Sequence, residues 1–226
     1  AVGSAHLILD LPVGKTMKIR HEKDAEKVLR KFQSLGSRFG IKVIGNITHT
    51  KEPAGAGVGP ILEAIDVLKV LEQAPDKPAQ LEKRSLELTG KLLDLCYKAQ
   101  RIKKDGNEEA KRILQSGDAL KKFKEIIHAQ GGDHSITSHK LKINAKIIQI
   151  KASHYGTIKN VHNYNLNSIA KLLGAPRDKH AGIYLHKKIG DTVTKDEVIL
   201  SFYAQTEYHL KEAQDTLQSF PIYTFT

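Results

Sequence analysis

The chain has 226 residues, of which 40% are apolar and 27% charged, and its formal net charge is +11. This length suits one large domain or two of modest size, and the composition is ordinary for a globular protein. No apolar run approaches the ~20 residues that a membrane-spanning helix needs. The single cysteine, Cys96, excludes an internal disulfide and a metal site built from several thiolates. We therefore expect a cytoplasmic protein without a membrane partner.

The positive charge raises nucleic acid as a partner. The lysines, however, mostly lie beside glutamates on predicted helices, as in residues 22–27, and the chain has no tryptophan. A surface that binds single-stranded nucleic acid more often combines lysines with aromatic side chains on which bases stack. We therefore favour a solvated basic surface over a nucleic-acid groove. Affinity for anionic metabolites is compatible with either.

The first fifty residues predict a strand–helix–strand unit. Residues 5–11 are almost all apolar, as in a strand that is covered on both faces. Apolar residues recur at helical spacing over residues 22–39, and residues 41–47 form a second short apolar run. Strands joined through a helix in this way lie parallel, with a right-handed connection in nearly all cases. Because the first strand lies so near residue 1, we expect further protein upstream.

A glycine-rich stretch, residues 52–60, follows the second strand and ends at Pro60, which suits the first position of a helix. Its Gly55-x-Gly57-x-Gly59 spacing matches neither the dinucleotide fingerprint nor the P-loop. Free amides at the start of the helix would hold a phosphate group. Alternatively, the glycines let the loop pass close to a neighbouring element. The sequence leaves both interpretations open.

Further helices are predicted from residue 60, over residues 79–97, after a cap at Asn107, and after a cap at Asp118 as far as residue 130. After these helices, residues 133–140 are polar and aperiodic and predict a linker.

The predicted linker divides the chain. Residues 1–132 form an α/β lobe made of the strand–helix–strand unit and the helices. Residues 141–226 form a C-terminal α+β domain of short strands and two helices, the second capped by Thr206.

The histidines and the cysteine predict no catalytic centre. The 11 histidines are scattered, and no His-x-x-x-His pair lies on a predicted helix. No Ser-His-Asp or Cys-His arrangement is evident from the order of the residues. We interpret the imidazoles as surface groups and Cys96 as a small apolar residue on an amphipathic helix.

Residues 189–199 resemble the glycine-aspartate turn of biotinyl and lipoyl carrier domains, with Gly190 at the tight turn and Val193 and Val198 in the core. A carrier also needs a lysine at a hairpin tip in a characteristic tripeptide, which this chain lacks. The segment therefore predicts a barrel-sandwich hybrid fold without swinging-arm chemistry. A carrier or scaffold module remains an alternative, and mass measurement of protein from its host would detect the modification.

Two segments are similar to the thymidine and pyrimidine-nucleoside phosphorylases. Residues 48–64 follow their T-x-x-x-x-P-x-G-x-x-V-G-x-x-L-E pattern, although Ala54 stands where most members have leucine. Residues 173–191 resemble part of the C-terminal domain of these enzymes, and the match is closest to the branch that contains AMP phosphorylase. Residues 9–14 and 129–133 fit the same branch, so the resemblance covers essentially the whole chain.

The resemblance implies a pentosyltransferase that carries out reversible phosphorolysis. Phosphate attacks the anomeric carbon of a nucleoside, and the base leaves to give a pentose 1-phosphate. In the family, the groups that hold the phosphate and the base come mainly from the first half of the polypeptide, and those motifs are not found here. The chain therefore resembles the C-terminal part of such an enzyme, with no catalytic residue of its own and no activity alone. Either thymidine or AMP fits as substrate, AMP giving adenine and ribose 1,5-bisphosphate.

Gly14, Lys15, Thr16 and Met17 are the substrate-binding candidates that the resemblance implies. They follow the strand that borders the nucleoside pocket in the family, although the loop is less rich in glycine here than is usual. Lys15 then approaches an anionic group, or it is a plain surface lysine.

A second loop resembles the mobile loop that approaches the cleft when the lobes of these enzymes close. Its candidate residues are Arg177, Lys179 and His180. Arg177 would brace closure through bidentate pairing, or it would form a local ion pair with Asp178.

Some relatives bind a monovalent or calcium ion near the glycine-rich loop, which nominates Asp66 and the backbone of residues 54–57 as ligands. Apart from phosphate as co-substrate, no cofactor is expected. The resemblance also implies a homo-oligomer for the full-length protein.

Overall fold

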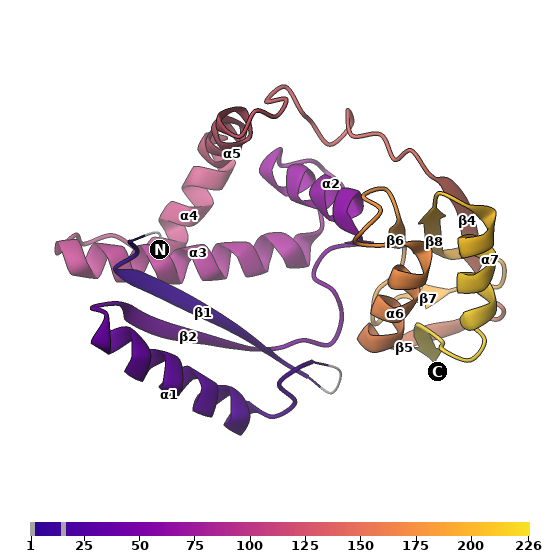
Figure 1. The fold of residues 1–226 in the computed structure, drawn as a ribbon, viewed down its shortest axis with the longest axis horizontal. Helices are drawn as coiled ribbons and strands as arrows, with labels where there is room; N and C mark the ends of the chain where they lie inside the picture. Colours follow the sequence, from indigo (N-terminus) through magenta and orange to yellow (C-terminus); the bar gives the residue numbers. More distant parts are fainter. Residues whose placement is uncertain (1–2, 15–16) are drawn as a thin grey trace. The chain divides into compact units, whose positions relative to one another are not determined.

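The computed structural model describes residues 3–14 and 17–226 (Figure 1). Contacts within the chain divide it into two compact units, Ala1–Thr50 with Glu82–Lys121, and Lys51–Leu81 with Lys122–Thr226. The mixed α/β character that the sequence predicts is confirmed. The predicted boundaries between the two domains, at residues 132 and 141, stay a prediction.

Helices and strands are mixed along the described chain, and α2 to α5 follow one another without a strand between them. The helices are α1 (Glu22–Arg38), α2 (Pro60–Leu71), α3 (Ala79–Gln100), α4 (Gly106–Gln115), α5 (Asp118–Ala129), α6 (Asn163–Leu173) and α7 (Glu207–Thr216). The strands are β1 (His6–Val13), β2 (Lys42–His49), β3 (Gly57–Val58), β4 (Lys146–Lys151), β5 (Gly156–Val161), β6 (Gly182–Leu185), β7 (Thr192–Val193), β8 (Val198–Ala204) and β9 (Tyr223–Phe225). None of the helices described is long and apolar enough to span a membrane.

The first unit is organised around the parallel pair of β1 and β2. The two strands are in register along their whole lengths, and α1 connects them. The small core of this pair consists of Leu11, Val13 and Ala25, each less than 7% exposed. Burying these apolar side chains stabilises the unit roughly in proportion to the area removed from water. The predicted strand–helix–strand unit is thus confirmed.

The second unit contains two antiparallel sheets. One has the strand order β3-β6-β8-β4 and the other β7-β5-β9. Helices α6 and α7 pack with these strands around a core that includes the fully buried Ile183 and Phe202. Strand β3 comes from the glycine-rich stretch, where Gly57 lies opposite Tyr184 and Val58 opposite Ile183. The sequence did not predict this strand, because two residues give no periodicity and their partner lies far along the chain.

Of the three predicted helix caps, Asn107 and Asp118 are wrong, and Asp118 is itself the first residue of α5. The carboxylate of Asp105, not Asn107, caps α4 by accepting hydrogen bonds from the backbone amides of Asn107 and Glu108, at 2.8 and 2.9 Å. A charged carboxylate is the stronger acceptor, and Asp105 holds the extended conformation that a cap requires. Thr206 caps α7 as predicted, with its Oγ1 3.2 Å from the amide of His209.

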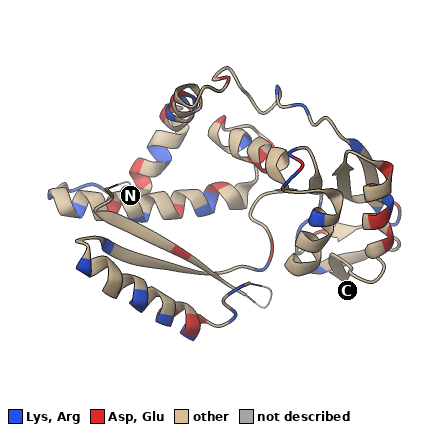
Figure 2. Ribbon diagram, in the orientation of Figure 1, with Lys and Arg blue, Asp and Glu red and all other residues tan. Residues whose placement is uncertain are grey.

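Basic and acidic side chains are mixed along the helices. Figure 2 shows lysines and arginines interspersed with acidic side chains on α3, whereas on α1 the acidic side chains lie near the start of the helix. On α1 two ion pairs join residues that lie about one helical turn apart. Asp24 pairs with Lys27 at 3.5 Å, and Glu26 pairs with Arg30 at 3.6 Å. Such exposed pairs contribute little to stability. Their arrangement agrees with the interpretation of the charge on these helices as a solvated surface.

Candidate functional site

The loop after β1 occupies the position in which α/β proteins often bind ligands. Because β1 and β2 are parallel, their carboxyl ends lie together, with Val13 opposite His49. The amide of Met17 donates to the carbonyl of Gly14 at 3.0 Å, and the amide of Gly14 donates to the carbonyl of Ile19 at 3.2 Å. The other two predicted substrate-binding residues, Lys15 and Thr16, lie outside the described residues. The substrate-binding role of this loop stays a prediction.

Thr50 lies directly beside this loop. Its amide donates to the carbonyl of Val13 at 2.9 Å, and a Cβ atom on Gly14 would lie 2.7 Å from its carbonyl oxygen. The close approach therefore requires glycine at position 14. The Thr50 Oγ1 is buried and has no hydrogen-bond partner among the described residues, so the edge of the sheet holds a buried hydroxyl that nothing described satisfies.

A cluster of polar side chains joins β1 and β2 to α3. Asp10 accepts from the Asn46 amide group at 2.9 Å and from the Arg84 guanidinium at 2.6 Å. Arg84 also donates to Thr48 Oγ1 at 3.2 Å, and the ammonium of Lys91 donates to Asn46 Oδ1. Sequence reasoning missed this cluster. The available signal was an aspartate inside an otherwise apolar strand and two polar residues two apart on the next.

In the second unit, Asp66 holds the backbone of the glycine-rich loop. The side chain is only 2% exposed, and its Oδ2 accepts hydrogen bonds from the amides of Ala56 and Gly57 at 2.7 and 2.8 Å. A Cβ atom on Gly55 would lie 2.5 Å from the same oxygen. The carboxylate and the glycines therefore fit one another. Of the two interpretations of the glycines, close approach to a neighbour is the one that this geometry supports.

Lys188 binds the same loop from the other side. Its ammonium donates to the carbonyls of Pro53 and Gly55 at 2.7 and 2.5 Å. Burial lowers the pKa of Lys188, and nearby carboxylates partly offset that effect. Next to it, the carboxylate of Glu52 accepts from the amide of Ile189 at 2.9 Å. The loop is thus fixed by charged groups of both signs.

These contacts bear on the ion that the resemblance implies near Asp66. The Asp66 Oδ2 is already engaged by two amides, and two of the neighbouring carbonyl oxygens are engaged by the Lys188 ammonium. Among the described residues, no three histidine, cysteine, aspartate or glutamate side chains gather closely enough to hold a metal. The residues in this arrangement do not fit an ion, and the site stays a prediction without support from the geometry.

The predicted closure loop follows α6. The backbone carbonyl of Lys179 accepts from the amide of Ile61 at 3.1 Å, which attaches the loop to the start of α2. His180 Nδ1 accepts from the amide of Asn144 at 3.2 Å. Arg177 is exposed, and in the described chain no ion pair joins it to Asp178. The geometry therefore does not support the local ion pair, and the closure role stays a prediction.

Comparison with known proteins shows which proteins these residues are similar to. Residues 157–221 match the pyrimidine nucleoside phosphorylase C-terminal domain. The chain is 35% identical to AMP phosphorylase 1 of Archaeoglobus fulgidus, over 94% of this chain and 41% of the relative. It is 40% identical to AMP phosphorylase of Methanosarcina barkeri, over 96% and 42%. It is 37% identical to the "Putative thymidine phosphorylase" of Legionella pneumophila, over 96% and 41%.

The chain spans about two-fifths of the length of the curated relatives it matches, in their C-terminal part. The resemblance stated from residues 48–64 and 173–191 is confirmed.

Proposed function

Since the chain carries the C-terminal domain of the pyrimidine nucleoside phosphorylases and matches the C-terminal part of their AMP and thymidine relatives, we propose that the protein containing it is a nucleoside phosphorylase. It cleaves thymidine or a related nucleoside with phosphate and releases the base and a (deoxy)ribose 1-phosphate. The observation that carries this proposal is the similarity that runs through 96% of the chain.

AMP is the second candidate substrate, and the names of several relatives favour it. Its phosphorolysis gives adenine and ribose 1,5-bisphosphate. The two candidates differ at the 5′ position, where AMP carries a phosphate and thymidine a hydroxyl. Direct competition between them in one assay therefore separates these proposals.

The contribution of this chain to the reaction is the loop at residues 14–17. The transition state develops positive charge on the sugar and negative charge on the leaving base, so the enzyme must hold a phosphate dianion and offer donors to the base. We assign none of these catalytic roles to residues of this chain. The chain alone is accordingly expected to be inactive, while Gly14 and its neighbours line the nucleoside side of the site.

We also propose that residues 141–226 form a barrel-sandwich hybrid. The antiparallel strands β6-β8-β4 and β7-β5-β9 support this fold, as does the turn at Gly190, where φ is 95°. The whole protein acts, in this proposal, as a cytoplasmic homo-oligomer in pyrimidine metabolism and nucleotide salvage, with neither membrane nor nucleic acid as a partner. The support for these points is the family resemblance and the mixed charge of the helices.

An assay of the longer protein tests the proposed function. We expect base to be released from thymidine or AMP only when phosphate is present, and no release by the present chain alone. Release of base by water without phosphate would contradict the reaction class. Release by the chain alone would contradict the assignment of the catalytic groups to other parts of the protein.

Gly14→Ala tests the substrate-binding loop in that longer protein. The added methyl group would meet the Thr50 carbonyl at 2.7 Å, so the loop must shift. We expect the KM for the nucleoside to rise roughly tenfold, equivalent to the loss of about 1.4 kcal/mol of binding, with a smaller change in kcat. An unchanged KM in a folded variant would remove the loop from the site.

A further inference from the structure

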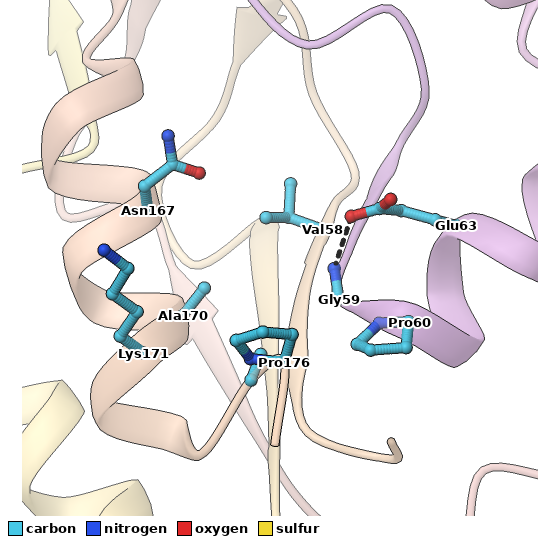
Figure 3. Close-up of a pocket in the computed structure, with 9 residues that line it drawn as sticks. Val58, Gly59, Pro60, Glu63, Asn167, Ala170, Lys171 and Pro176 are labelled. Carbon is cyan, nitrogen blue, oxygen red and sulfur yellow. Dashed lines mark hydrogen bonds between the residues drawn. The ribbon is translucent and has the colours of Figure 1, made fainter. Parts of the chain in front are cut away.

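A pocket of about 470 Å³ lies in the second unit, where the start of α2 meets α6 (Figure 3). Its polar lining residues are Glu63, Asn167 and Lys171. The apolar part of its lining consists of Val58, Pro60, Ala170, Ala175 and Pro176. This volume falls within the range of roughly 300–1,000 Å³ that is usual for small-molecule sites. Val58, Gly59 and Pro60 come from the glycine-rich stretch, but none of the lining residues is among the partners of Asp66 and Lys188 described above.

The polar groups stand on two opposing walls. Glu63 lies on α2, while Asn167 and Lys171 lie one turn apart on α6 and so share a face of that helix (Figure 3). The amide of Gly59 donates to Glu63 Oε1 at 3.0 Å, which fixes the carboxylate. Gly59 has a φ of 133°, and a Cβ atom there would lie 2.4 Å from the Ala181 carbonyl, so this backbone geometry requires glycine.

The groups on the α6 wall are free to bind something else. Asn167 and Lys171 are both exposed, and neither side chain makes a hydrogen bond to another residue that the structure describes. An ammonium binds a phosphate group, while a carboxamide and a carboxylate accept hydrogen bonds from hydroxyl groups. The negative charge of Glu63 disfavours a second anionic group on its own side. A ligand must therefore place its phosphate near Lys171 and its neutral hydroxyls toward Glu63.

The apolar lining narrows the class of ligand further. Proline, alanine and valine side chains suit the carbon skeleton of a small sugar. None of the residues that line the pocket is aromatic, so the lining offers a nucleobase nothing on which to stack. We propose that this pocket binds a small phosphorylated sugar, with its phosphate on Lys171 and its hydroxyls on Asn167 and Glu63.

The site is separate from the catalytic proposal. The phosphorolysis proposed above releases a pentose 1-phosphate, which belongs to this class of compound. The product of that reaction is therefore one candidate ligand of the pocket. The assignment rests on the lining residues and not on that reaction. Binding is measured without turnover, so its failure leaves the proposed function standing, and failure of the proposed function leaves the pocket standing.

Titration of the chain with ribose 5-phosphate tests the site. We expect saturable binding at one site by calorimetry, with amide NMR shifts at residues 59–63 and 167–171. Ribose and inorganic phosphate should each bind at least about tenfold more weakly, because each offers only part of the hydrogen bonds, and one charged hydrogen bond is worth that much. AMP should bind no more tightly than ribose 5-phosphate.

Matched variants locate the contacts. Lys171→Met should weaken ribose 5-phosphate binding about tenfold, while Lys211→Met, on the exposed face of α7, should leave it unchanged. Glu63→Gln keeps the acceptor for Gly59 but removes the charge, so it should narrow the preference for ribose 5-phosphate over inorganic phosphate. Unchanged melting temperatures will show that the variants fold.

Four results would overturn the proposal. They are the absence of saturable binding, equal affinity for inorganic phosphate, tighter binding of AMP, and an equal loss in the two lysine variants. The last result would indicate general attraction to a basic surface.

Discussion

Each of the two units contains an aspartate that takes part in a polar cluster, and the two aspartates differ in what they hold. Asp66 in the second unit is 2% exposed and bonds to backbone amides of the glycine-rich loop. Asp10 in the first unit has a side chain that is 29% exposed, and it bonds to the side chains of Asn46 and Arg84. The first arrangement fixes the path of the chain, whereas the second ties strands to a helix through groups that water can also reach. Replacing Asp66 should therefore lower the free energy of unfolding more than replacing Asp10.

Asp66→Ala gives the largest expected effect. It leaves the amides of Ala56 and Gly57 without their buried acceptor, so we expect the free energy of unfolding to fall by about 3 kcal/mol. Urea unfolding of the chain measures the change. The matched control, Asp215→Ala on the exposed face of α7, should change it by less than about 0.5 kcal/mol. Similar values for the two variants would contradict the scaffold role of Asp66.

A double-mutant cycle on Asp10 and Arg84 measures the strength of the polar cluster in the first unit. We expect Asp10→Asn and Arg84→Met to show a coupling energy of about 1 kcal/mol, because the pair is close but partly solvated. The control is the more exposed pair of Glu26 and Arg30 on α1, which should couple more weakly. A coupling as large as the whole effect of Asp66→Ala would remove the distinction between the two clusters.

His186 and Ser201 provide a side-chain pair within the second unit, with His186 Nε2 2.8 Å from Ser201 Oγ. Burial, and then the charge of Lys187, lower the pKa of His186 below its ordinary 6.5. As the pH falls through that value, the unfolded chain takes up a proton before the folded chain does, so the folded state loses stability.

The expected effect of this pair is the smallest, because His186 is partly exposed. His186→Gln should flatten the loss of unfolding free energy between about pH 7 and about pH 5, relative to the unchanged chain. Urea unfolding at several pH values measures it. Parallel curves for the two proteins would show that His186 does not titrate differently on folding.

Local patterns predicted most of the helices and strands but few of the contacts between them. The apolar periodicity gave β1, α1 and β2 with nearly correct bounds, since each pattern lies within a short window. The cluster of Asp10 and Arg84 joins residues 74 positions apart, and no local pattern identifies such a partner. Strand β3 was missed for the same reason.

The same difference between local patterns and long-range contacts applies to the candidate sites. The resemblance led to the loop that contains Gly14 and to Asp66 on α2. It could not indicate that Asp66 binds backbone amides, since that depends on how the glycine-rich loop folds back on α2. The pocket beside Lys171 joins residues of two helices distant in sequence, so only the structure reveals it.

Exchange of the matched segment tests the central claim most directly. This chain would replace the C-terminal 42% of AMP phosphorylase from Methanosarcina barkeri that it matches, and adenine release from AMP would be measured with and without phosphate. The account predicts phosphate-dependent release by the hybrid. A hybrid that folds and assembles like the unchanged relative yet releases no adenine, under conditions in which that relative does, would contradict it.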